Sequence, residues 1–285
     1  MDNLRHSAIH KFRTIVFGYS LLFRGGFQSR NDFALWCDRW WLTRHPFTPN
    51  RPKPNAKWFA LLRGAWPREP CASELIEDFP LLAQVLDDPL WTVLDWEGNA
   101  ADLAIGFIRR VRINDTPLLP FSNKVMETLC GCPDWRRLAF LVALLRTRST
   151  QYLFHRLWLQ KNFACYVELV CMTVPCCACC SELYRHLHAL YLLGQLGAVD
   201  HWPQDLQSFF IALEGQESLW ATLAKMNWFH EMDTFSVTML WCVAAAHPLL
   251  LPRFAQEQYD CPPGLLRRVH TTLSTHANTL IKVVD

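Results

Sequence analysis

Glycine is scarce in this sequence, and the loop motifs built on glycine are missing. The chain has 11 glycines in 285 residues, about 4% against a usual frequency of about 7%. No G-x-x-x-x-G-K-[ST], G-x-G-x-x-G or G-x-S-x-G motif occurs. The sequence therefore lacks the phosphate loops of P-loop proteins, dinucleotide-binding proteins and kinases, and the nucleophile elbow of serine hydrolases. We expect a protein that is not an enzyme.

Long uncharged segments are also missing. Two long ones are Leu169–Ser181 and Thr234–Pro252, of which the second is the longest in the chain, whereas a membrane-spanning helix needs about 20 predominantly apolar residues. Polar residues and prolines interrupt the second segment, so we expect a buried helix ending near His247 and no membrane contact. The apolar run Thr14–Phe23 resembles part of a signal peptide, but Arg24 and two glycines follow it in place of a cleavage site.

Cysteine is too rare and too clustered for a disulfide scaffold. The 12 cysteines are about 4% of the chain, below the 8–10% typical of such scaffolds. Disulfides persist in oxidising compartments, and the clustering here does not form an evenly spaced framework. We therefore predict a reducing compartment, the cytoplasm.

The composition and the apolar periodicity predict an all-α protein. Hydrophobic residues make up 51% of the chain and charged residues 19%, which is typical of a folded core. Successive amphipathic segments predict an irregular helical array or bundle of roughly a dozen helices, possibly solenoid-like, although no repeat of 30–45 residues recurs. We divide the chain into a basic, Trp-rich helical region with a Pro-rich connector, residues 1–70, and a helical array, residues 71–285.

The expected helices follow from capping residues and apolar spacing. Asn31 is expected to cap the second helix, Asn99 the helix from Ala100, and Asp134 a helix with arginines at the margins of its apolar face. The segments Thr14–Phe23, Leu90–Trp96 and Ile105–Ile113 retain a strand alternative. The predicted helices are 2–23, 32–43, 56–64, 73–86, 89–96, 100–112, 135–148, 149–174, 175–194, 203–214, 218–228, 233–247 and 263–283.

Positive charge is concentrated at the N-terminus. Residues 1–68 hold 12 of the 28 basic residues but only three of the 26 acids, which leaves 16 bases and 23 acids in the rest of the chain. This asymmetry favours an acidic partner. Within it, bases and aromatic residues alternate as they do on surfaces that bind phosphates and stack on bases. The candidate binding residues are Arg39, Trp40, Trp41, Arg44, Arg51, Lys53, Lys57 and Trp58.

The same segment has a structural interpretation, which we favour. Prolines 46, 49, 52 and 54 predict an extended connector whose basic residues are solvated. The tryptophans would then anchor the flanking helices, and the bases could pair with acidic residues of the same chain.

The stretch from Cys176 to Cys180 holds four cysteines in five positions, followed by His186 and His188. If Pro175 begins a helix, then Cys176, Cys179 and Cys180 share one face with Leu183, Leu187 and Leu190, and the thiols are buried core residues. The C-x-x-C spacing also allows a zinc or redox site. A second ligand pair at a distance is missing, so we predict core packing, no bound metal and no cofactor.

These observations predict a non-enzymatic protein that binds another macromolecule through a helical surface, as an adaptor, a scaffold or an immunity-type inhibitor. Its partner is expected to be a protein, and the charge asymmetry favours an acidic one. One alternative is a nucleic-acid-binding protein that uses the basic aromatic region. A second alternative is a zinc-binding or redox protein that uses the cysteine cluster.

Overall fold

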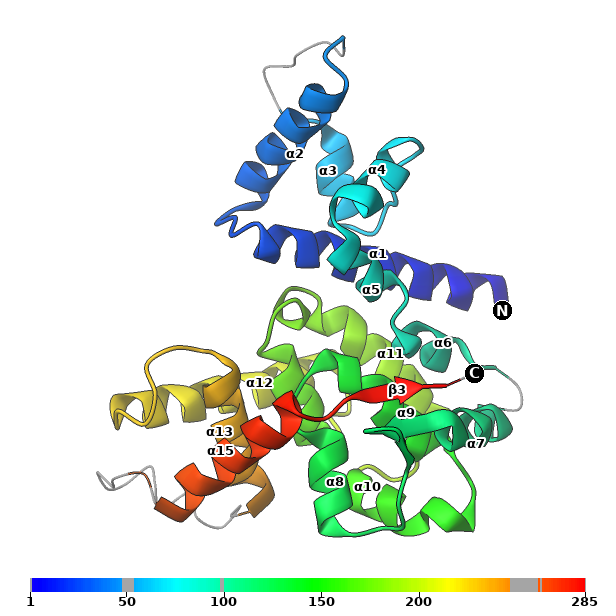
Figure 1. Ribbon diagram of the computed structural model, residues 1–285, viewed down its shortest axis with the longest axis vertical. Helices are drawn as coiled ribbons and strands as arrows, with labels where there is room; N and C mark the ends of the chain where they lie inside the picture. The colour runs from blue at the N-terminus through cyan, green and yellow to red at the C-terminus, as the bar shows by residue number, and fades with distance from the viewer. Residues whose placement is uncertain (1, 48–53, 98–99, 247–260, 262, 285) are drawn as a thin grey trace. The chain divides into compact units, whose positions relative to one another are not determined.

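The computed structural model describes residues 2–47, 54–97, 100–246, 261 and 263–284. These residues are mostly helical (Figure 1), which confirms the all-α prediction. The chain divides into two compact units, Met1–Asp95 and Trp96–Asp285.

The first unit is built on one long helix. Helix α1 (Asp2–Arg24) contacts α3 (Ala56–Leu61), α5 (Pro80–Leu86) and α6 (Pro89–Asp95), while α2 (Arg30–Arg44) packs on α3 and α4 (Cys71–Asp78) on α5. Phe12 of α1 is buried and meets Trp91 of α6 edge to face at 5.3 Å. The alternative of strands at Thr14–Phe23 and Leu90–Trp96 is therefore wrong. Thr14 fits the helix because its hydroxyl donates to the His10 carbonyl at 2.9 Å.

The second unit is organised around α10 (Leu153–Cys171), which contacts α9 (Leu138–Arg146), α12 (Leu206–Lys225) and α13 (Thr234–Ala246). All nine residues of α9 are buried, so this short helix lies inside the core. The remaining helices cover this centre: α7 (Ala100–Arg110) packs on α9, α11 (Cys180–Leu192) on α12, and α15 (Pro263–Ala277) on both α13 and α8 (Asn123–Cys130) (Figure 1).

A small antiparallel sheet in the second unit was predicted only in part: the strand alternative for Ile105–Ile113 is confirmed for Val111–Ile113 and wrong for the residues that belong to α7. Strand β1 (Val111–Ile113) pairs with β2 (Thr116–Pro117) and with β3 (Ile281–Val283) in the order β2-β1-β3 (Figure 1). The turn between β1 and β2 places Asn114 and Asp115 at φ 49° and 66°, the left-handed pair that a tight hairpin requires. The predicted helices 100–112 and 263–283 consequently end at Arg110 and Ala277.

Several helix boundaries differ from the prediction. Ser29, rather than Asn31, caps α2, because its hydroxyl accepts from the Asp32 amide at 3.1 Å. The helices expected at 203–214 and 218–228 form the single helix α12, which passes through Gly215; a helical glycine costs only about 1 kcal/mol. Helix α8 was not predicted, and Asn99 lies outside the described residues.

Asp134 is confirmed as a cap, although a 3₁₀ turn (Trp135–Arg137) precedes α9. The prediction that arginines line the margins of this helix is wrong for Arg137 and Arg146, which are buried. The Arg137 guanidinium donates to the carbonyls of Thr128 and Leu129 at 2.7 and 2.9 Å. These bonds offset the cost of burying the charge.

The apolar run at Thr234–Pro252 begins with a buried helix, as predicted. Helix α13 ends at Ala246, and residues 247–252 lie outside the described residues. Among the described helices, none combines the length and the apolar character needed to cross a bilayer.

Candidate functional site

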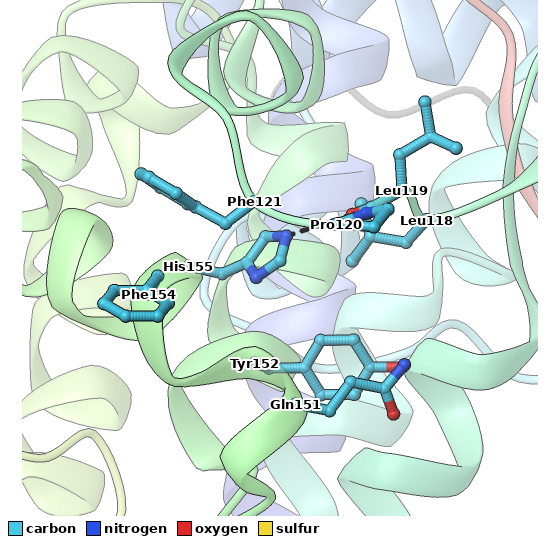
Figure 2. Close-up of a pocket in the computed structure, with 8 residues that line it drawn as sticks. All are labelled: Leu118, Leu119, Pro120, Phe121, Gln151, Tyr152, Phe154 and His155. Carbon is cyan, nitrogen blue, oxygen red and sulfur yellow. Dashed lines mark hydrogen bonds between the residues drawn. The ribbon is translucent and has the colours of Figure 1, made fainter.

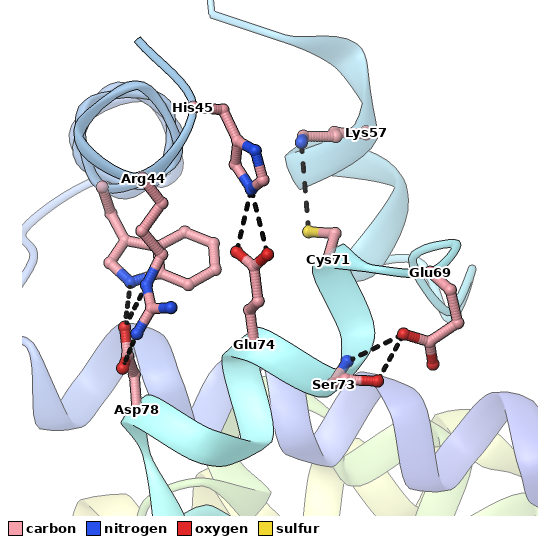
Figure 3. Close-up of polar contacts among 9 residues, drawn as sticks. Arg44, His45, Lys57, Glu69, Cys71, Ser73, Glu74 and Asp78 are labelled. Atoms are coloured by element: carbon pink, nitrogen blue, oxygen red, sulfur yellow. Dashed lines mark hydrogen bonds and ion pairs between the residues drawn. The ribbon is translucent and has the colours of Figure 1, made fainter.

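In the first unit, the predicted binding residues Trp40 and Arg44 of α2 share one internal partner. The Trp40 indole and the Arg44 Nε both donate to Asp78 Oδ2, at 2.7 and 2.9 Å, and the Arg44 Nη2 pairs with Oδ1 (Figure 3). The bond from Trp40 and the neighbouring guanidinium lower the pKa of Asp78. Asp78 ends α4, so these contacts tie α4 to α2.

Trp58 and Lys57 of α3 also have interaction partners within the first unit. Trp58 is fully buried, and its indole nitrogen donates to Asp38 Oδ1 at 2.7 Å. The Lys57 ammonium lies 3.9 Å from the ring centroid of Trp41 and 4.2 Å from that of Trp58. Both distances are typical of cation–π contacts.

Trp41 also stacks on His45, with ring centroids 3.9 Å apart, and the His45 Nε2 lies 3.0 Å from both carboxylate oxygens of Glu74 (Figure 3). Arg39 is exposed, whereas Arg51 and Lys53 lie outside the described residues. Five of the eight predicted residues, Trp40, Trp41, Arg44, Lys57 and Trp58, therefore have partners within the first unit. A nucleic acid would have to compete for them, and this alternative stays a prediction.

The cysteine stretch does not form one continuous helix. A 3₁₀ turn (Cys176–Ala178) follows Pro175, and α11 starts only at Cys180. Cys176 and Cys179 are nevertheless buried, while Cys177 is exposed and Cys180 half-buried. The expected core position is thus found for two thiols and not for Cys180.

The environment of two buried thiols, Cys176 and Cys171, keeps them protonated. A hydrogen bond with Cys179, together with burial, raises the pKa of Cys176 well above its usual value, and burial does the same for Cys171. The Cys179 thiol donates to the Pro175 carbonyl at 3.5 Å. Within the described part of the chain, no three His, Cys, Asp or Glu side chains come together as metal ligands.

A pocket of about 560 Å³ lies in the second unit. One wall is the loop between β2 and α8, and the other is the 3₁₀ turn (Thr150–Tyr152) with the first residues of α10 (Figure 2). Its lining is mostly apolar and consists of Leu118, Leu119, Pro120, Phe121, Gln151, Tyr152, Phe154 and His155. The volume falls within the range of about 300–1,000 Å³ typical of ligand pockets.

His155 has an unsatisfied acceptor that is buried beside this pocket. Its side chain is buried, and Nε2 lies 3.2 Å from the Leu119 carbonyl oxygen. A carbonyl only accepts, so Nε2 carries the proton and Nδ1 is an acceptor. Nδ1 is buried without a hydrogen-bond partner among the described residues and faces the side of Gln151 and Tyr152 (Figure 2). Burial lowers the pKa of His155, which keeps the ring neutral.

The rim of the pocket carries large apolar side chains that remain in water. Phe154 is 63% exposed and Leu119 56%, and the rings of Phe154 and Phe121 lie 6.0 Å apart. Leu157 follows Phe154 at the i, i+3 spacing and is also exposed. Exposed apolar groups that gather beside a pocket are typical of an interaction site.

The charges near the pocket are basic. Arg109 acts electrostatically on the Tyr152 hydroxyl. No acidic residue is among those that line the pocket.

Sequence reasoning missed this pocket because its two walls lie about 30 residues apart in the chain. The available signal was weak: the helix predicted at 149–174 carries apolar residues on every side, so some of them must face solvent or another protein. No protein-family model, curated protein or solved structure matches this chain.

Proposed function

We propose that this protein is a non-enzymatic binding protein that takes an apolar segment of an acidic partner protein in the pocket between residues 118–121 and 151–155. The observation that carries the proposal is the exposed apolar rim, Leu119 and Phe154, beside an apolar pocket. Covering this rim on binding would remove apolar area from water, which favours association by about 25 cal/mol per Å².

The chemistry of the pocket supports one kind of occupant. The aromatic walls suit a ring, so a partner tryptophan or tyrosine side chain fits the pocket. The neighbouring Arg109 favours acidic residues next to that ring.

The lining supports binding rather than catalysis. It contains no carboxylate and no thiol. Burial lowers the pKa of His155 and raises that of Tyr152, so both side chains are uncharged near neutral pH. General acid–base catalysis uses groups whose pKa lies near the working pH, and the lining does not offer a pair of this kind.

Free cysteines support the inference of a reducing compartment such as the cytoplasm, where an adaptor, scaffold or inhibitor would work. All twelve are free thiols, and disulfides are rare in reducing compartments.

A peptide selection tests the proposed function. A phage-displayed library of 12-residue peptides is selected against the full chain, and the enriched peptides are assayed against F154A and against L192A as a matched control. Phe154 and Leu192 are both exposed, at 63% and 71%, so neither change should disturb the fold. We expect peptides that combine tryptophan or tyrosine with Asp or Glu, and at least about tenfold weaker binding to F154A alone. Peptides that bind both variants as tightly as the wild type would contradict the proposal.

A further inference from the structure

A second pocket in the same unit is lined by arginines, and no acid is among the described residues that line it. It has a volume of about 440 Å³ and contains Arg146, Arg148 and Arg156 together with Gln160 and Gln195. None of its lining residues is Asp, Glu, His or an aromatic residue. The pocket lies where the segment after α9, the first half of α10 and the loop after α11 meet.

Two of these arginines are positioned by neutral oxygens. The Arg156 guanidinium donates to Thr147 Oγ1 at 3.0 Å and to the Ser149 carbonyl at 2.7 Å. The Arg146 Nη2 donates to the Trp96 carbonyl at 2.7 Å and to Gln195 Oε1 at 2.6 Å. The bonds from Arg156 orient its guanidinium without cancelling its charge.

Arg148 and Arg156 form no ion pair with an acidic residue in the described part of the chain. No carboxylate lies within ion-pair distance of either guanidinium in that part of the chain, and Arg148 is exposed. Burial lowers the pKa of Arg156, as expected for a guanidinium that loses water without gaining an anion. Asp102, in the first turn of α7, is exposed and is not part of the lining.

Neutral donors complete the pocket. The Gln160 side-chain amide lies against Gly197, whose φ is +69°, and a Cβ at this glycine would collide with the amide nitrogen. The Gln160 amide can occupy this position because Gly197 has no side chain. Ala100 and Ala101 at the start of α7 also line the pocket, and the amides of a first helical turn point toward anions.

We infer that this pocket binds the phosphate group of a phosphate monoester. Paired guanidinium forks match a phosphate in geometry and can neutralise its two charges. The volume leaves room for more than the phosphate, and the polar lining suits hydroxyl groups. Because no aromatic side chain is present to stack on a base, a sugar phosphate or a phosphorylated serine fits better than a nucleotide. The inference does not depend on the apolar pocket, since the two sites share no lining residue.

Calorimetric titration of the full chain tests this inference with three probes at constant ionic strength: inorganic phosphate, glucose 6-phosphate and a phosphoserine peptide. We expect saturable binding with one site per chain. Glucose 6-phosphate binding tighter than the other probes would assign the phosphate to a small molecule, and the phosphoserine peptide binding tightest would assign it to a partner protein.

Three variants separate the pocket from general surface charge. R148Q removes a charge that makes no internal hydrogen bond in the described structure, R156Q removes the anchored guanidinium, and R136Q is the control because Arg136 is exposed and outside the pocket. We expect Kd to rise at least about tenfold in R148Q and R156Q and to stay within about twofold of the wild type in R136Q. R148Q keeps the test valid if R156Q does not fold. The inference is overturned if the wild type binds none of the probes at millimolar concentration, or if R136Q weakens binding as much as R148Q.

Discussion

Serine substitution is expected to lower the stability of the protein at Cys176 and to leave it almost unchanged at the adjacent Cys177. Cys176 is fully buried, whereas Cys177 next to it is exposed. C176S places a hydroxyl in the core where a weakly polar thiol was, and a buried hydroxyl without a good partner costs about 1–3 kcal/mol. C177S changes a group that already contacts water, so its effect should stay within about 0.5 kcal/mol.

The assay is urea and thermal denaturation of the wild type and both variants. For a unit of this size, C176S should lower Tm by roughly 2–12 °C, from about 2–4 °C per kcal/mol. C177S should leave the midpoint unchanged. Native-state labelling with a thiol reagent gives an independent readout, because it should modify Cys177 quickly and Cys176 only on unfolding.

A metal or redox site would give a different pattern. If the cluster bound zinc, both cysteines would be ligands, both variants would lose stability, and unfolding would release about one zinc ion per chain. Equal destabilisation of C176S and C177S, or stoichiometric zinc in the purified protein, would refute the assignment of Cys176 to the apolar core.

Two further predictions concern backbone space and pH. Gly64 has φ +93°, and a Cβ at this position would lie 2.8 Å from the Lys11 carbonyl oxygen. G64A should therefore lower the free energy of unfolding by about 2–5 kcal/mol. G106A lies in open space on α7 and should raise the free energy of unfolding by about 0.4–1 kcal/mol in the same urea titration. A loss of stability in G106A would contradict this reasoning. Burial lowers the pKa of His155 and His276. Below about pH 6.5 the unfolded chain therefore binds protons that the folded chain does not. The free energy of unfolding should decrease as the pH is lowered, by up to about 1.4 kcal/mol per pH unit for each histidine. H155F should remove the share of this slope that His155 contributes; an unchanged slope in H155F would contradict the prediction.

Local patterns allowed most helices to be predicted from the sequence. The 3.6-residue apolar spacing and capping residues such as Asp134 act within one turn of chain, so they identify a helix without knowledge of its neighbours. The same rules failed where contacts between residues distant in the sequence determine the secondary structure. Residues 281–283 form a strand only because Val111–Ile113 lies beside them, and Gly215 stays helical because α12 packs on α10 and α13.

The candidate sites needed the tertiary structure for the same reason. The Trp and Arg residues of the N-terminal region were visible in the sequence, but only the fold shows that Asp38 already binds Trp58 and that Asp78 binds Trp40 and Arg44. The apolar pocket and the arginine pocket join segments about 30 to 50 residues apart, and such distances carry no signal in a single sequence.

The sequence by itself therefore determined a helical chain with a cysteine-lined core, because those properties depend on short-range spacing and burial preference. Tertiary packing decided which charges remain unmatched and which apolar side chains stay exposed, since both depend on what the rest of the chain brings next to them.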